Sequence, residues 1–100
     1  MEYGFTTLDS RFPTLQMKKV IIYSTRICPF CVRAKNFFSK KDIPFEDIMV
    51  DQDPEQLKIM LEKSQRQSVP QIFIGDYHVG GFDDLIEHDM DGKLENLLED

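Results

Sequence analysis

The spacing of two cysteines constrains this 100-residue chain more than any other feature. Cys28-Pro29-Phe30-Cys31 holds both cysteines of the sequence, between the apolar run at residues 20–23 and a segment with helical periodicity. This order predicts a strand, a turn and a helix, with the first cysteine at the start of the helix. Unpaired N–H groups and a partial positive charge at a helix N-terminus favour the thiolate form of a cysteine. A second cysteine one turn later can resolve the mixed disulfide that the first one forms.

The cysteine pair has three other possible interpretations. Two core cysteines can fall at this spacing by accident. A structural disulfide across two residues closes a loop too short to stabilise the fold much. A zinc ion needs four ligands, and the remaining soft candidates, His78 and His88, lie far along the chain without the usual histidine spacing. A redox-active dithiol is therefore the preferred interpretation, and no metal site is predicted.

Composition limits the class of protein and its partners. One hundred residues suit a single domain, and the net charge of −6 argues against nucleic acid as a partner. No run of eighteen apolar residues occurs, so we expect no membrane span, and residues 1–16 lack the apolar stretch of a secretory signal. A dithiol without such a signal predicts a cytoplasmic protein. Basic residues gather in 17–41 around the cysteines, where they favour a thiolate and an anionic substrate, although solvated helix faces give the same pattern.

The chain divides into an N-terminal extension at residues 1–16 and a domain at residues 17–100. The extension shows neither helical nor strand periodicity. It is either disordered or packs apolar side chains on the surface of the domain.

Periodicity and breakers predict the order β-α-β-α-β-β-α, followed by a short last helix. The strands are expected at residues 19–24, 45–50, 71–74 and 77–79. The helices are expected at 29–41, after an Asp53 N-cap, from Phe82, and at 93–98. The inward-facing residues are expected to be Cys31, Ala34, Phe37, Phe38, Leu57, Met60, Leu61, Ser64, Leu94, Leu97 and Leu98. The first β-α-β unit should be a right-handed parallel crossover.

Three motifs in this order resemble the dithiol glutaredoxins. They are Cys28-Pro29-Phe30-Cys31, Ser68-Val69-Pro70 and Gly80-Gly81-Phe82-Asp83-Asp84-Leu85. The resemblance covers residues 17–99. It implies an α/β thioredoxin fold, with a four-stranded mixed sheet flanked by helices.

The resemblance also implies a glutathione site. In the family, the proline corresponding to Pro70 is held in cis, which turns the backbone of Val69 towards the cysteinyl part of glutathione. The N–H groups of Gly81, Phe82 and Asp83 would hold the γ-glutamyl carboxylate at a helix start. Asp84 would pair with the γ-glutamyl ammonium.

One further contact is expected, and several residues differ from those usual in the family. Arg66 is expected to meet the glycine carboxylate of glutathione. Phe30 stands where the family often has tyrosine, and it keeps the apolar wall. Ser68 replaces the usual threonine. Thr25 stands where the family usually has lysine, and we expect Arg26 to take over part of the electrostatic support of the thiolate.

The resemblance predicts a glutathione-dependent thiol–disulfide oxidoreductase. Cys28 would be the nucleophile and Cys31 the resolving thiol, with glutathione as co-substrate and no bound cofactor. The expected partners of a monomeric enzyme are glutathionylated or disulfide-containing proteins and, indirectly, glutathione reductase. Two alternatives stay open at this point: a redoxin served by thioredoxin reductase without glutathione, and an iron–sulfur scaffold that uses Cys28 and glutathione as ligands.

Overall fold

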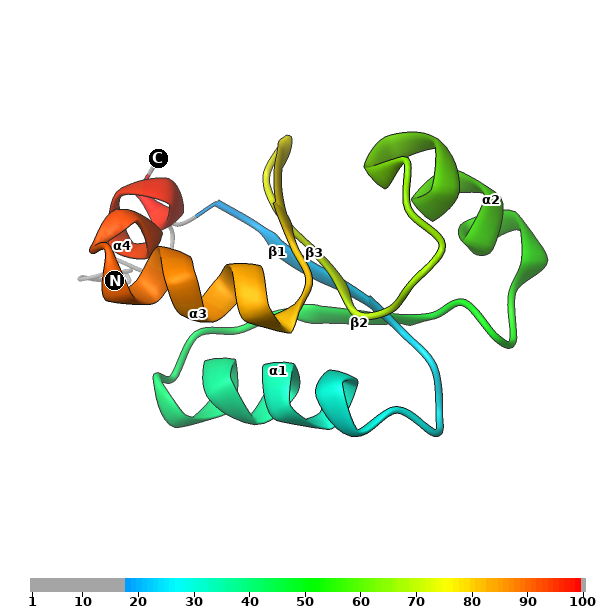
Figure 1. Cartoon of the computed structure of the whole chain (residues 1–100), viewed down its shortest axis with the longest axis horizontal. Coiled ribbons are helices and arrows are strands. Elements are labelled where there is room, and N and C mark those ends of the chain that lie inside the picture. The colour runs from blue at the N-terminus through cyan, green and yellow to red at the C-terminus, as the bar shows by residue number, and fades with distance from the viewer. Residues whose placement is uncertain (1–17, 100) are drawn as a thin grey trace, which may run out of the picture.

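The computed structural model describes residues 18–99. They form eight elements in the predicted order (Figure 1): β1 (Val20–Ser24), α1 (Pro29–Lys40), β2 (Glu46–Met49), α2 (Pro54–Ser64), β3 (Gln71–Ile74), β4 (Tyr77–Gly80), α3 (Phe82–Met90) and α4 (Lys93–Leu98). The predicted boundaries differ from these by one residue at most. The extension expected at residues 1–16 lies outside the described residues. Within 18–99, no helix is long and apolar enough to cross a membrane.

The four strands form one mixed sheet in the order β2-β1-β3-β4. β1 and β2 are parallel and joined through α1, whereas β3 is antiparallel to both β1 and β4. Helices α1, α3 and α4 supply the core of one face of the sheet, and α2 supplies that of the other. Figure 1 shows α1 and α3 side by side and α2 apart from them. The predicted α/β architecture, a four-stranded mixed sheet flanked by helices, is confirmed.

β1 is buried on both faces, as its uninterrupted apolar sequence predicts. Val20 and Ile22 point into the larger core cluster, with Phe38 of α1. Ile21 and Tyr23 point the other way, towards the smaller cluster under α2. Because successive side chains of a strand alternate between faces, one short strand contributes to both cores. Burial of each large apolar side chain contributes about 1.5–3 kcal/mol to folding.

Two helices begin as their sequences predict. Cys28 is the N-cap of α1 and Pro29 occupies its first turn, where no N–H donor is needed. Asp53 caps α2, and its carboxylate accepts the N–H groups of Glu55 and Gln56 at 3.2 and 3.3 Å. Such a cap contributes about 1 kcal/mol to helix stability.

One predicted core position is wrong. Leu57 was expected on the inner face of α2, but its side chain is 37% exposed. The helix is only 11 residues long and packs on the sheet through its C-terminal half, where Met60 and Ser64 are buried. Leu57 has the correct helical phase but lies one turn too early.

Gly80, the last residue of β4, permits a close approach between that strand and α3. Its φ is +116°, and a Cβ at this position would lie 2.9 Å from the Cβ of Asp84. Both the backbone conformation and the contact exclude a side chain.

We therefore predict that Gly80→Ala lowers the free energy of unfolding by about 2–3 kcal/mol, measured by urea denaturation. Gly92→Ala is the control, because Gly92 also has positive φ, +75°, but no atom lies within 4 Å of its Cβ position. The control should lose only the strain energy, about 1 kcal/mol. Equal losses in the two variants would show that the contact with Asp84 costs nothing.

Candidate active site

Cys28 is the residue from which α1 starts, and its sulfur accepts a hydrogen bond from the helix. Its backbone is extended, with φ −156° and ψ 105°, and the N–H group of Cys31 donates to its Sγ at 3.3 Å. The Sγ atom also lies 3.7 Å from the carbonyl oxygen of Val69, within reach of a thiol donor. Cys28 is half-buried. A partly accessible sulfur at a helix N-terminus suits a nucleophile.

Cys31 faces inward and is only 1% exposed. The pKa of the Cys31 thiol is raised to about 12, chiefly by burial and secondly by the hydrogen bond with Cys28. A hydrogen bond from the Thr25 backbone and the charge of Lys35 act in the opposite direction. Both cysteines are free. The two sulfurs therefore differ in accessibility, as a nucleophile and a resolving thiol require.

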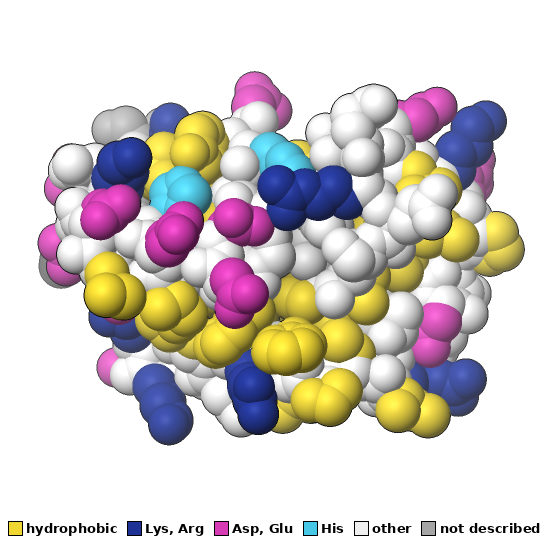
Figure 2. Space-filling model, in the orientation of Figure 1, with side chains coloured by type: hydrophobic (Ala, Val, Ile, Leu, Met, Phe, Trp, Pro, Cys, Tyr) yellow, Lys and Arg dark blue, Asp and Glu magenta, His cyan; other side chains and the backbone are white. Residues whose placement is uncertain are grey.

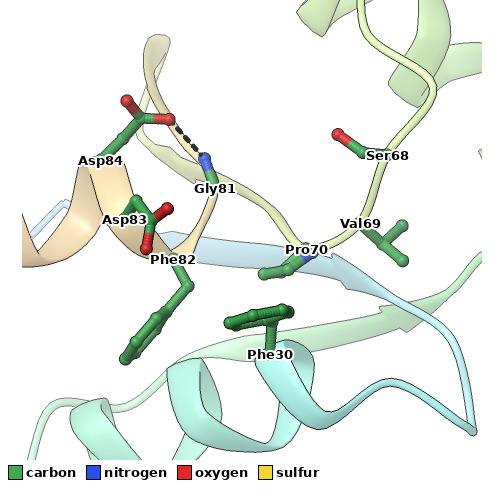
Figure 3. Close-up of a pocket in the computed structure, with 8 residues that line it drawn as sticks. All are labelled: Phe30, Ser68, Val69, Pro70, Gly81, Phe82, Asp83 and Asp84. Atoms are coloured by element: carbon green, nitrogen blue, oxygen red, sulfur yellow. Dashed lines mark hydrogen bonds between the residues drawn. The ribbon is translucent and has the colours of Figure 1, made fainter.

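A pocket of about 180 Å³ opens beside the cysteines. Figure 3 shows that α1, the loop before β3 and the start of α3 each contribute to its walls. The lining residues are Phe30, Ser68, Val69, Pro70, Gly81, Phe82, Asp83 and Asp84. These segments lie far apart in the sequence and are brought together by the sheet order β1-β3-β4.

The loop before β3 is held by a buried amide. The Val69-Pro70 peptide bond is cis, as the family resemblance implied. The Nε2 atom of Gln71 donates to the carbonyl oxygen of Ser68 at 2.9 Å, and its Oε1 lies 2.7 Å from Nε2 of His78. Sequence reasoning missed this role of Gln71. The available signal was a single polar residue beginning the otherwise apolar, fully buried strand β3.

Asp84 closes the other end of the pocket. Its Oδ2 accepts the N–H of Gly81 at 2.9 Å, drawn as a dashed line in Figure 3, and lies 3.1 Å from Nη1 of Arg66. The Gly81 hydrogen bond, first, and the Arg66 guanidinium, second, hold the pKa of Asp84 below its usual range. Phe82 and Asp83 follow in the first turn of α3, where backbone N–H groups have no partner within the helix.

Aromatic rings form the apolar wall between these polar ends. The ring centroids of Phe30 and Phe82 are 6.3 Å apart, and Phe30 is half exposed. The Arg33 guanidinium lies 5.2 Å from the centroid of Phe30. On the face in Figure 2, a band of hydrophobic side chains separates acidic residues over α3 from basic residues over α1. The site therefore combines an apolar surface with both signs of charge.

The structure brings together most of the predicted site residues. All eight residues that line the pocket were among those expected to contact glutathione, and Arg66 reaches its edge through Asp84. Arg26 instead points to Asp51, whose Oδ2 accepts from the backbone N–H of Arg26 at 3.2 Å and from its Nε at 3.3 Å. Those hydrogen bonds hold the pKa of Asp51 below its usual range.

Each of the two histidines forms a hydrogen bond with another side chain. His78 bonds Gln71, and Nε2 of His88 lies 2.9 Å from the hydroxyl of Tyr77. Within residues 18–99, no three side chains of the ligating types are gathered closely enough to hold a metal ion. The zinc arrangement considered from the sequence is therefore not assembled in this part of the chain.

The fold and the paired thiols define a dithiol protein of the thioredoxin fold, and comparisons identify its family. Residues 20–79 match the glutaredoxin family. Glutaredoxin of Pseudomonas aeruginosa is 44% identical over 82 residues, which cover 82% of this chain and 98% of the relative. Glutaredoxin 3 of Escherichia coli K12 is 42% identical over 82 residues, with 82% and 99% covered.

Solved structures agree with the sequence comparisons. The solution structure of a glutaredoxin from Brucella melitensis superposes with a TM-score of 0.73 at 45% identity, covering 84% of this chain and 91% of that one. A buckwheat glutaredoxin–glutathione complex superposes with a TM-score of 0.74 at 30% identity, covering 81% and 76%. The chain belongs to the glutaredoxin family and is a thiol–disulfide oxidoreductase.

Proposed function

We propose that this enzyme uses glutathione to reduce glutathione mixed disulfides and protein disulfides through Cys28 and Cys31. One observation carries the proposal: the Cys28 sulfur lies at the start of α1, 3.7 Å from the carbonyl of Val69, which lines the pocket. A peptide-like thiol bound there would present its sulfur to Cys28. The buckwheat relative, solved as a complex with glutathione, supports this choice of ligand.

Each part of the pocket suits one part of glutathione. The backbone of Val69 would pair with the cysteinyl residue as a neighbouring strand does. The N–H groups of Phe82 and Asp83, with the dipole of α3, favour the γ-glutamyl carboxylate, whereas the expected N–H of Gly81 is already bonded to Asp84. The hydroxyl of Ser68 adds a polar group to this wall.

Arg66 and Asp84 are the charged side chains that we propose to meet the ends of glutathione. Asp84 would receive the γ-glutamyl ammonium, and Arg66 the glycine carboxylate. A guanidinium carries five N–H donors in a planar fork, so Arg66 can hold Asp84 and a substrate carboxylate together. Phe30 and Pro70 would cover the apolar middle of the ligand.

Glutathionylated substrates would react by a monothiol route. The Cys28 thiolate attacks the glutathione sulfur, a Cys28–glutathione disulfide forms, and the substrate leaves as a thiolate that takes up a proton. A second glutathione thiolate then attacks the glutathione sulfur of this disulfide, which releases oxidised glutathione and restores Cys28. NADPH would supply the electrons through glutathione reductase, without a bound cofactor.

Protein disulfides would react by a dithiol route. Cys28 forms a mixed disulfide with one substrate sulfur and releases the other. Cys31 then attacks Cys28, which frees the first substrate sulfur as a thiol. Two molecules of glutathione later reduce the Cys28–Cys31 disulfide.

We also propose a minor electrostatic role for Arg26, which stands next to Thr25 where the family usually has lysine. Arg26 forms an ion pair with Asp51, which partly neutralises the charge of the guanidinium. Both side chains also face solvent, so we expect the effect of Arg26 on the Cys28 thiolate to be small. The helix N-terminus would supply most of the stabilisation of the thiolate.

The two routes predict different outcomes for the two cysteines. Cys28→Ser should abolish activity on every substrate. Cys31→Ser should keep turnover of a glutathionylated peptide and lose most of the turnover of a protein disulfide, since only the second needs a resolving thiol. Both are measured as NADPH consumption with glutathione and glutathione reductase. If Cys31→Ser were as inactive as Cys28→Ser on the glutathionylated peptide, the monothiol route would be wrong.

Asp84 offers a test of ligand recognition. Asp84→Asn keeps an acceptor for the N–H of Gly81 but removes the charge, so the helix cap survives. Loss of a charge partner for the ligand ammonium costs about 1.5–3 kcal/mol, so KM for glutathionylated substrate should rise about tenfold or more. Asp89→Asn is the control, because it removes a carboxylate of the same helix that pairs with Lys41 at 3.5 Å. An unchanged KM in Asp84→Asn would leave Asp84 as a helix cap only.

A further inference from the structure

The dithiol route requires a negative charge on the sulfur of Cys31, although burial of this sulfur disfavours the charge. Cys31 must become a thiolate before it can attack the mixed disulfide on Cys28. It is almost completely buried, beneath Cys28. Burial disfavours the charged form of a thiol. A nearby positive charge or hydrogen-bond donor would offset the cost of burying the Cys31 thiolate during the resolving step.

Lys35 is placed for this. It lies four residues after Cys31 in α1, so both side chains are on the same face of the helix. The positive charge of Lys35 favours the thiolate form of Cys31. The Lys35 side chain is only 25% exposed, which leaves its field less screened than that of a surface lysine.

Two further groups hold the Lys35 ammonium in place. Its Nζ lies 2.7 Å from Oδ2 of Asp47 in β2, and the other oxygen, Oδ1, accepts the Ser24 hydroxyl at 2.5 Å. Ser24 is fully buried and ends β1, just before the turn that leads to Cys28. The sulfur of Met49 also lies near the Ser24 hydroxyl, at 3.3 Å.

This cluster of Lys35, Asp47 and Ser24 follows from strand alternation. Ile48 packs into the core under α2, so its neighbours Asp47 and Met49 face α1. Ile22 of β1, which pairs with Asp47, also faces α1. A polar cluster is thereby held against the buried side of α1, next to the resolving cysteine.

We propose that Lys35, positioned by Asp47 and Ser24, stabilises the Cys31 thiolate in the resolving step. The proposal deepens the proposed function, on which it rests. Lys35 is a positioning and electrostatic residue for Cys31 and takes no part in the first attack by Cys28. The other groups that act on Cys31 are the Cys28 sulfur, which opposes the charge, and the Thr25 backbone, which favours it.

The step balances without a further reactant. The Cys31 thiol loses its proton to solvent, the thiolate attacks Cys28, and a Cys31–Cys28 bond replaces the bond between Cys28 and the substrate. The substrate sulfur leaves as a thiolate and takes up one proton. Two electrons pass from the dithiol to the substrate disulfide.

A stoichiometric reaction isolates this step from glutathione. Excess reduced protein is mixed with 5,5′-dithiobis(2-nitrobenzoate), and released thionitrobenzoate is followed by its absorbance. Attack by Cys28 releases the first thionitrobenzoate, and attack by Cys31 on the resulting mixed disulfide releases the second. Cys31→Ser shows only the first phase and so assigns the two phases.

Lys35→Met should slow the second phase about tenfold, equal to one unit of pKa, and leave the first phase unchanged. Its second phase should reach a given rate about one pH unit higher than in the wild type. Lys35→Arg keeps the charge and should restore the rate to within about twofold. Lys35→Gln serves as a second neutral variant if the methionine variant does not fold.

Lys19→Met is the matched control. It removes an ion pair of the same length, 2.7 Å, that also anchors to β2, at Glu46, but lies on the surface. Both phases should stay as in the wild type. The proposal is overturned if Lys35→Met leaves the second phase unchanged, if it slows both phases equally, or if Lys35→Arg is as slow as Lys35→Met. Failure of glutathione turnover in the wild type would instead count against the proposed function, since this reaction contains no glutathione.

Discussion

The hydrogen bond from the Cys31 N–H to the Cys28 sulfur is the interaction on which the active site depends. It places one sulfur at the start of α1 and buries the other one turn later. The helix N-terminus favours negative charge on the first sulfur, whereas burial opposes it on the second. In the mechanism that we propose, this difference decides which cysteine attacks first. β1 and the core contacts of α1 are required to hold the helix start in place.

A pocket lies next to this arrangement, and we propose that it binds glutathione. The sheet brings the loop before β3 and the start of α3 next to the cysteines, and each contributes backbone polar groups. Gly80 lets β4 pass directly into α3, so that Asp84 caps the helix and pairs with Arg66. The residues that we propose to bind glutathione therefore lie close together in the fold. Such preorganisation reduces the entropic cost of binding.

Sequence patterns predicted the fold and the lining of the pocket, because both depend on local signals. Periodicity located every described element, and the three motifs contain all the pocket residues. What the sequence did not reveal depends on tertiary distance. The pairing of Arg26 with Asp51, the buried amide of Gln71 and the Lys35–Asp47 pair join residues from different elements. Leu57 is likewise exposed because α2 contacts the sheet only through its C-terminal half.

We propose that the pocket beside Cys28 makes this enzyme dependent on glutathione. The most direct measurement compares two reducing systems, each driven by NADPH, on one glutathione mixed disulfide. We expect rapid NADPH consumption with glutathione plus glutathione reductase and none above background with thioredoxin reductase alone. Turnover with thioredoxin reductase and none with glutathione would contradict it, and would show that the polar ends of the pocket, Asp84 and Arg66, serve another purpose.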